Sequence, residues 1–191
     1  MSRTIAVFCS SSSRIAPHYF AAADDFGQRL ADRGWTLVYG GSDVGLMGAV
    51  ARAAKAGGGR VIGVIPEMLH ARGIAYAEAD ELIVTPDLRQ RKAQMAALAD
   101  AFVALPGGVG TLEEILEVLA LKDLSCHHKP VVFLNTAGFY DRLAALFEQL
   151  YHEGFSRPAL RHLHTFVPDV PALMAYLEAY QPPDVPRKWG G

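Results

Sequence analysis

Residues 101–117 read AFVALPGGVGTLEEILE, a strand pattern that runs through a glycine turn into the start of an acidic helix. The apolar run from Ala101 to Leu105 is typical of a strand buried in a parallel sheet. The turn holds the three glycines Gly107, Gly108 and Gly110. Because glycine leaves the backbone bare, the amide N–H groups of the turn can close around an anion. We expect Thr111 to cap a helix whose positive dipole end points at the same place, which predicts a phosphate site.

The alternation of strand and helix patterns extends along the chain. Short apolar runs predict strands at Thr4–Cys9, Thr36–Tyr39, Val61–Ile65, Leu82–Val84, Ala101–Leu105 and Val131–Leu134. Amphipathic segments predict helices at His18–Asp32, Leu46–Ala56, Arg89–Leu98, Leu112–Leu121, Tyr140–Glu153 and Pro171–Tyr180. This alternation indicates an α/β protein with a Rossmann-like, open, mostly parallel sheet and helices on both faces. We expect one nucleotide-binding domain over residues 1–180 and a loose tail over residues 181–191, which contains three prolines and two glycines.

Size and charge exclude several classes of protein. The 191 residues suffice for one core, and 18 basic and 20 acidic residues give a formal net charge of −2. Because binding to nucleic acid or a membrane surface usually requires a basic excess, we expect neither partner. The first apolar run is too short for a signal peptide, and no stretch approaches the roughly 20 apolar residues of a membrane helix. Two cysteines form no disulfide framework, which favours a cytoplasmic protein.

Three predicted strands end in loops of small residues. Four serines beginning at Ser10 follow the first strand, and residues 40–48, which include Gly41, Gly45 and Met47, follow the second. The glycine turn is the third such loop. Ligands of open parallel sheets bind beyond the carboxyl ends of the strands. The loops are either ordinary tight turns or parts of one ligand site, and finding three of them favours the ligand site.

The glycine-containing loops do not match the motifs that bind larger nucleotides. A dinucleotide fingerprint requires Gly-x-Gly-x-x-Gly after the first strand, where this chain has serines. A P-loop ends in Gly-Lys-Ser or Gly-Lys-Thr, and neither glycine loop has that ending. The sequence therefore favours a small monophosphate as the ligand.

Charged residues near the glycine turn have more than one interpretation. Thr111 and Glu114 have the spacing of a capping box, so Glu114 is either a helix cap or a functional carboxylate. Arg91 and Lys92 lie near the start of the helix that precedes the Ala101 strand, where cations oppose the helix dipole. They either form a solvated charged face or contact the ligand, and we expect at least one of the two to be functional. Glu113 and Glu117 have the pattern of exposed helix residues, although Glu113 lies close enough to the turn to contact a ribose.

The remaining histidines and cysteines give weaker signals. His127, His128, His162 and His164 have no further ligands at a metal-binding spacing, so we expect surface histidines and no metal. Cys9 precedes the serine loop and either lies near the ligand or packs as a small core residue.

Several of these motifs resemble those of the LOG (Lonely Guy) family. The stretch from Pro106 to Glu114 is similar to the family's Pro-Gly-Gly-x-Gly-Thr-x-x-Glu motif, and Arg91-Lys92 is similar to its second signature. Further similar segments are Val7–Ser13, Val38–Gly41, Val44–Gly48, Val61–Pro66, Lys129–Val131 and Asn135–Asp141. The similarity spans roughly residues 5–155, which makes it more specific than one glycine motif.

The resemblance implies hydrolysis of the N-glycosidic bond of N6-substituted adenosine 5′-monophosphates, which gives a free base (a cytokinin) and ribose 5-phosphate. It implies Arg91 and Glu114 as the catalytic pair, with Lys92 and the segment from Gly107 through Val109 to Glu113 lining the substrate site. It also implies a homodimer. Some members carry the label lysine decarboxylase, which finds no support here because no lysine has a recognisable pyridoxal-phosphate context.

The implied chemistry fits the residue types and needs no metal or redox cofactor. Departure of the base builds positive charge at the ribose C1′, which the carboxylate of Glu114 would stabilise, or it would orient the attacking water. Arg91 would either relieve the charge on the departing purine or anchor the phosphate. Two alternatives remain: a general nucleosidase for AMP and related monophosphates, and a non-catalytic carrier of a nucleotide or molybdenum cofactor on the same fold.

Overall fold

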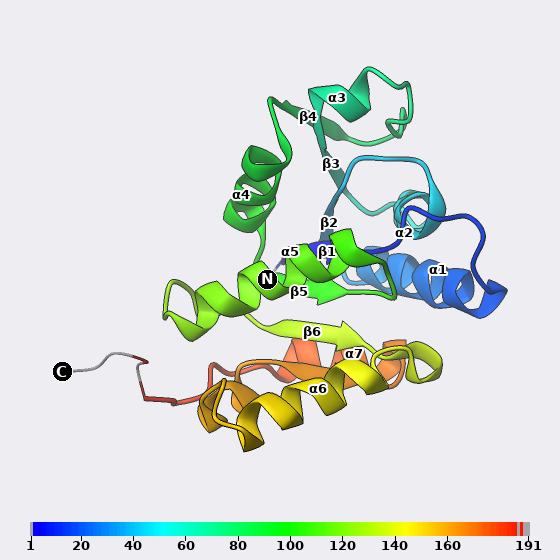
Figure 1. Ribbon diagram of the computed structural model, residues 1–191. Helices are drawn as coiled ribbons and strands as arrows, with labels where there is room; N and C mark the ends of the chain where they lie inside the picture. The colour runs from blue at the N-terminus through cyan, green and yellow to red at the C-terminus, as the bar shows by residue number, and fades with distance from the viewer. Residues whose placement is uncertain (1, 187, 189–191) are drawn as a thin grey trace.

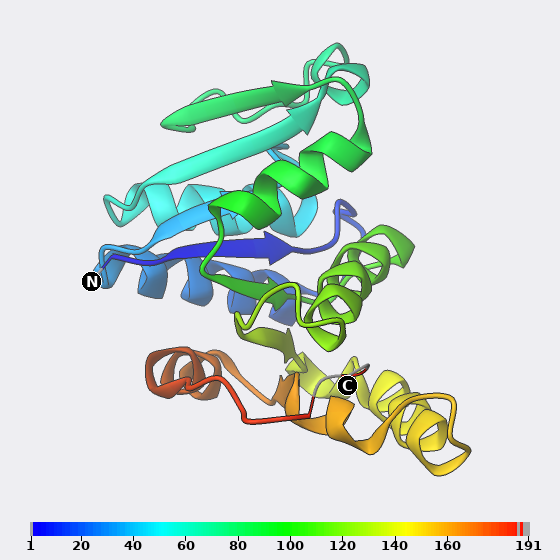
Figure 2. The same ribbon diagram turned by 90° about the vertical axis from the view of Figure 1, so that its left-hand side faces the viewer.

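The computed structural model describes residues 2–186 and 188. Seven strands in these residues form one sheet in the order β4-β3-β2-β1-β5-β6-β7, and every neighbouring pair is parallel. Figure 2 shows the arrowheads of β1, β3 and β4 pointing to the same side of the molecule. The strands are β1 (Thr4–Phe8), β2 (Thr36–Tyr39), β3 (Val61–Pro66), β4 (Glu81–Thr85), β5 (Ala101–Ala104), β6 (Val131–Leu134) and β7 (Thr165–Val167). The prediction of an α/β fold with a parallel sheet is confirmed.

Helices cover both faces of the sheet. Helices α1, α2 and α7 pack on one face, and α4, α5 and α6 pack on the other (Figure 1). The α-helices are α1 (Pro17–Asp32), α2 (Gly45–Ala56), α3 (Glu67–His70), α4 (Leu88–Leu98), α5 (Val109–Asp123), α6 (Asp141–His152) and α7 (Val170–Ala179). Two 3-10 helices span Thr136–Gly138 and Pro158–His162. No helix in the described part of the chain is long and apolar enough to cross a membrane.

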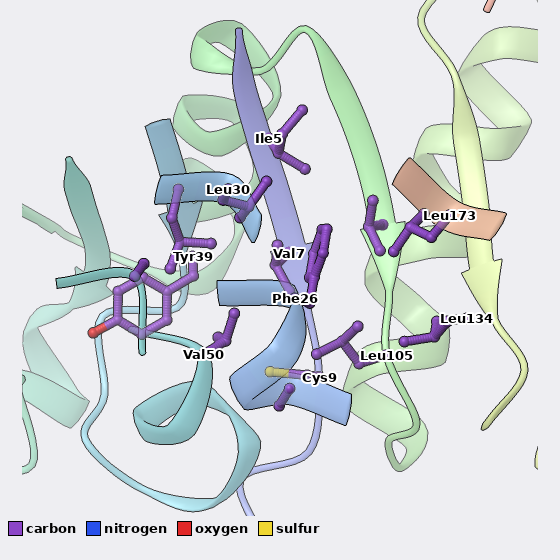
Figure 3. Close-up of a cluster of buried hydrophobic side chains, with 14 of the residues drawn as sticks. Ile5, Val7, Cys9, Phe26, Leu30, Tyr39, Val50, Leu105, Leu134 and Leu173 are labelled. Atoms are coloured by element: carbon purple, nitrogen blue, oxygen red, sulfur yellow. The ribbon is translucent and has the colours of Figure 1, made fainter. Parts of the chain in front are cut away.

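The central strands are buried on both sides because helices cover both faces. β5 and β6 are buried along their whole length, which explains their unbroken apolar sequences. Alternate side chains of β1 enter different cores: Ile5 and Val7 pack toward α1 and α2, as Figure 3 shows, and Ala6 and Phe8 pack toward α4 and α5. Two apolar layers therefore hold the sheet in place and fix the positions of the strand ends.

The order of the strands creates one switch point. The chain adds β2, β3 and β4 on one side of β1 and then returns to place β5 on the other side. The loops after β1 and β5 consequently depart in opposite directions, and such a point is where open α/β sheets bind ligands. The serine loop and the glycine turn are these two loops.

Some elements differ from their predicted bounds. The strand β7 and the short helix α3 were not predicted, because three or four residues give too little periodicity to detect. The expected helix cap at Thr111 is wrong: α5 begins at Val109, and Gly108 is its N-cap. The helix α4 packs against β3 and also contacts β1, β2 and β4.

The tail makes several contacts in its described part. Val185 packs beside the core on the α5 face, and Arg157 donates to the carbonyl of Pro186. Lys188 forms an ion pair with Asp123 at 2.8 Å. The remainder of the predicted loose tail, residues 187 and 189–191, lies outside the described residues, and the division into domain and tail stays a prediction.

Candidate functional site

A cavity of about 430 Å³ opens at the carboxyl ends of β1, β2 and β5. The three loops of small residues meet at this cavity, and backbone hydrogen bonds join them: Ser10 N donates to Pro106 O at 3.2 Å, and Leu46 N donates to Ser10 O at 2.9 Å. The predicted site residues that line it are Ser10, Met47, Arg91, Gly108, Val109, Gly110, Thr111 and Glu114. The three loops thus line one cavity, and the binding of a ligand there stays a prediction.

The N-terminus of α5 faces this cavity without a side-chain cap. Gly108 provides the N-cap and forms no side-chain hydrogen bond, so the first N–H groups of the helix have no partner within it. A Cβ atom on Gly107 would overlap the side chain of Thr111, so only glycine allows the chain to turn this tightly into the helix. The amides of Val109, Gly110 and Thr111 are thereby available to an anion.

Arg91 and Glu114 meet on the wall of the cavity. Nη1 of Arg91 donates to Oε1 of Glu114 at 2.7 Å, and their side chains are only 10% and 11% exposed. The carboxylate of Glu114 therefore does not cap its own helix, and that alternative is wrong. The physical reason is that the N-cap is Gly108, three residues earlier than the capping box requires, while an arginine on another helix offers a charged partner.

Burial dominates the ionisation of Glu114. Removal from water raises its pKa above the usual value, against the opposing attraction and hydrogen bond of Arg91. A carboxyl group in such a setting can exchange a proton with a reacting water nearer to neutral pH than an exposed glutamate.

Two backbone features hold the guanidinium of Arg91. Its Nε donates to the carbonyl of Val64, the residue of β3 beneath it, at 3.0 Å. A Cβ atom on Gly40 would overlap Nη2 of Arg91 and would lie 2.7 Å from Sδ of Met47. Gly40 thus leaves the space that the guanidinium occupies. Sequence reasoning placed Gly40 in the second loop but assigned it no role, since its neighbour in space is distant in the chain.

Comparison with known proteins places the chain in a family. A family profile described as "Possible lysine decarboxylase" matches residues 47–177. The chain is 46% identical over 181 residues to a probable cytokinin riboside 5′-monophosphate phosphoribohydrolase, LOGL5 of Oryza sativa subsp. japonica, covering 95% of this chain and 74% of that protein. It is 43% identical over 180 residues to the cytokinin riboside 5′-monophosphate phosphoribohydrolase LOG5 of Arabidopsis thaliana, covering 94% and 79%. The chain belongs to the LOG family.

The fold of this LOG-family chain also occurs in a carrier protein. The molybdenum cofactor carrier protein of Chlamydomonas reinhardtii superposes with a TM-score of 0.70 at 25% identity, covering 93% of this chain and 97% of that one. A shared fold does not establish a shared activity, because function resides in the site.

Other predicted site residues of the LOG-family chain lie behind the cavity wall. Gly41 and Gly45 adopt positive φ values of 74° and 56° and do not line the cavity. A Cβ atom on Gly45 would lie 2.5 Å from the carbonyl carbon of Ser11, so this glycine allows α2 to approach the serine loop. Gly107 lines a neighbouring apolar cavity of about 270 Å³ instead.

Lys92 and Glu113 also lie outside the cavity lining. The ammonium group of Lys92 pairs with the carboxylates of Glu113 and Glu117 on α5. Burial lowers the pKa of Lys92, but the hydrogen bonds to the two glutamates outweigh that effect and raise it. Whether either residue touches substrate stays a prediction. Sequence reasoning missed the lining residues Val7, Phe8 and Leu69, whereas Ser11, Ser12 and Ser42 lie in loops that it predicted without singling these residues out.

The cysteine and histidine expectations have mixed outcomes. Cys9 is both buried and a cavity-lining residue, and burial raises the pKa of its thiol far above the usual value. His164 is buried among aromatic rings, so its expected surface position is wrong; His127 is half-buried and hydrogen-bonds Val118 O at 2.8 Å. Among the described residues, no group of three or more His, Cys, Asp or Glu side chains could hold a metal ion.

Proposed function

We propose that this chain hydrolyses the N-glycosidic bond of N6-substituted adenosine 5′-monophosphates and releases a free cytokinin base and ribose 5-phosphate. Relatives that carry this activity in their names align with 94–95% of the chain, which supports the proposal. The observation that carries it is the buried Arg91–Glu114 pair, which lies on the wall of a cavity that also holds an uncapped helix N-terminus.

In the proposed complex, the N-terminus of α5 binds the 5′-phosphate. Amides of Val109, Gly110 and Thr111 would donate to its oxygens, and the helix dipole favours the negative charge. Binding of the phosphate fixes the ribose relative to Glu114, so that C1′ and the carboxylate are held in a defined orientation before the reaction. A nucleoside without the phosphate would lose this orientation.

Glu114 and Arg91 would then act on the bond between C1′ and the base. As this bond breaks, its electron pair moves to the base and positive charge develops at C1′, which the carboxylate of Glu114 stabilises. A water oxygen bonds to C1′, and its proton passes to the carboxylate or to the departing base. Arg91 is held by Val64 O and Glu114, which supports a role beside the ribose and the base rather than at the phosphate.

A panel of four compounds tests the proposal: N6-isopentenyl-AMP, AMP and the nucleosides of both. We expect release of ribose 5-phosphate from the monophosphates, fastest from the isopentenyl compound, and little cleavage of the nucleosides. Equal turnover of AMP would indicate the general nucleosidase. Tight binding of a nucleotide or of molybdenum cofactor with no cleavage of any compound would indicate a carrier. A carrier is the second candidate because the Chlamydomonas carrier protein has the same fold.

We also propose a homodimer and a cytoplasmic location. Exposed apolar side chains on α3, β4 and α4, namely Met68, Val84 and Leu88, would be covered in a dimer. Cys9 and Cys126 are free thiols, which suits a reducing compartment. Sedimentation equilibrium of the purified protein tests the first proposal, and cell fractionation tests the second.

A further inference from the structure

Lys92 joins two helices beside the candidate catalytic pair. Its Nζ forms ion pairs with Glu113 and with Oε2 of Glu117, the latter at 2.5 Å, which connects α4 to α5. The lysine side chain is 18% exposed, whereas those of the two glutamates are 55% and 43% exposed. The ammonium group is therefore partly enclosed between the helices and is already occupied by two carboxylates.

Two of the three ion pairs between these helices join consecutive residues of both. Consecutive residues of α4, Arg91 and Lys92, pair with consecutive residues of α5, Glu114 and Glu113 respectively. The Arg91–Glu114 pair, the inner pair, faces the cavity, and the Lys92–Glu113 pair, the outer pair, lies on the solvent side. Any change in the outer pair that moves α4 along α5 also moves the guanidinium of Arg91 relative to the carboxylate of Glu114.

Charge provides a second connection between the pairs. Glu113 and Glu117 are one helical turn apart, so their like charges repel unless a cation lies between them. Glu113 also directly precedes Glu114 in the chain. Without the ammonium of Lys92, a negative charge next to Glu114 would no longer be offset.

We propose that Lys92 is a positioning residue that fixes α4 against α5 and offsets the charge of Glu113, so that the Arg91–Glu114 pair keeps its geometry and its charge. As far as activity is concerned, this inference rests on the proposed function. It assigns Lys92 a role through its neighbours, whereas the family resemblance implied a residue that lines the substrate site.

The ionisation of Glu114 agrees with this role. Burial raises the pKa of Glu114, Arg91 on α4 lowers it, Glu113 raises it and Lys92 lowers it. The thiol of Cys9, at the end of β1, also interacts with Glu114, and burial raises the pKa of that thiol so that it stays uncharged. Removal of the lysine charge should therefore raise the pKa of Glu114, and removal of the Glu113 charge should lower it.

Three variants test this: Lys92→Met, which keeps the aliphatic stem, Glu113→Gln, and both together. In Lys92→Met we expect kcat to fall about tenfold with KM within about twofold, because a positioning defect acts on the chemical step. The acid limb of the pH profile of kcat should move to higher pH, by a few tenths of a unit to about one unit. Glu113→Gln should move the limb to lower pH, and the double variant should return it toward the wild type.

Suitable controls separate this role from others. Lys55, in the last turn of α2, pairs with Asp80, and neither residue lines the cavity, so Lys55→Met should leave the acid limb in place. Lys92→Arg keeps a cation between the helices and should recover most of kcat. If Lys92→Met instead raises KM about tenfold or more, leaves the limb unmoved and is not rescued by Glu113→Gln, then Lys92 binds substrate and the proposal is wrong.

A spectroscopic readout makes the test independent of turnover. The ¹³C-carboxyl resonance of Glu114, assigned from the Glu114→Gln spectrum, reports the pKa of this residue directly in the wild type and in Lys92→Met. A higher pKa in the variant supports the proposal, and an unchanged pKa overturns it. If the wild type cleaves no monophosphate, the proposed function fails, yet the titration still decides the role of Lys92.

Discussion

Arg91 and Glu114 form a buried ion pair between α4 and α5, with Nη1 and Oε1 2.7 Å apart. Each charge is the main compensation for the other, since both side chains are about nine-tenths buried. Removing one partner of such a pair leaves an uncompensated buried charge, which costs several kcal/mol. This relationship makes the pair both a structural element and the proposed reaction centre, so variants must be chosen to separate the two.

Glu114→Gln keeps the shape and a hydrogen-bond acceptor for Arg91 but removes the negative charge. We expect kcat for N6-isopentenyl-AMP to fall by about 10²–10³-fold with a small change in KM, because charge is needed mainly as the bond to the base breaks. Chromatographic quantification of the released base measures this. Substantial residual turnover would show that another group provides the catalysis.

Arg91→Lys preserves the positive charge but not the forked geometry. The guanidinium contacts Val64 O and Glu114 from two different nitrogen atoms, whereas the donors of an ammonium all lie on one atom, so we expect at least a tenfold loss of kcat. A thermal melt close to that of the wild type would assign the loss to geometry rather than to unfolding. An active lysine variant would mean that charge alone is sufficient at this position.

Gly40→Ala introduces a methyl group where the guanidinium of Arg91 lies. The guanidinium of Arg91 and the thioether of Met47 must both move to accommodate it, and we expect a loss of activity of about tenfold or more. The Arg91→Ala background is the control: with the guanidinium absent, the same substitution should cost little further activity. Full additivity of the two losses would show that Gly40 acts independently of Arg91.

Gly110→Ala tests the proposed phosphate site. A Cβ atom there meets no other atom within 4 Å, so the fold should be unaffected, yet the residue lines the cavity. We expect the KM for 5′-monophosphates to rise by about tenfold, since the methyl group hinders approach to the helix N-terminus. Inorganic phosphate should also inhibit the variant less than the wild type. Unchanged values of both would place the phosphate elsewhere.

His164 should make the fold sensitive to acid. Burial lowers its pKa to about 4, while an unfolded histidine titrates near 6.5. The unfolded state therefore binds the extra proton first, and stability present above pH 6.5 falls as the pH drops toward 4, by up to about 3 kcal/mol. Urea denaturation at a series of pH values measures this slope.

A matched pair of variants assigns this acid sensitivity. His164→Phe keeps an aromatic ring next to Phe133, Phe147 and Phe166 and should flatten the slope between pH 6.5 and 4. His162→Asn, at an exposed position, should leave the slope as it is. The same slope in His164→Phe would assign the acid sensitivity to other groups.

Much of the fold was predictable because local patterns encode it. Apolar runs such as Ala101–Leu105 and the amphipathic segments between them predicted the parallel α/β sheet, and the glycine turn predicted a cavity at its carboxyl edge. The strand β7 escaped detection because three residues carry no measurable period. The start of α5 was predicted too late in the chain because Thr111 matches the residue preference of an N-cap, whereas the helix uses Gly108 as its N-cap.

The sequence by itself determined the architecture and the residue types of the site, since both depend on short-range periodicity and on motif spacing. Only the tertiary structure decided the partners. It paired Glu114 with Arg91, 23 positions away, rather than with its own helix start, and it placed Gly40 against that arginine. It also turned Lys92 toward Glu113 and Glu117. These choices depend on how two helices pack on one sheet face, and no local pattern encodes that packing.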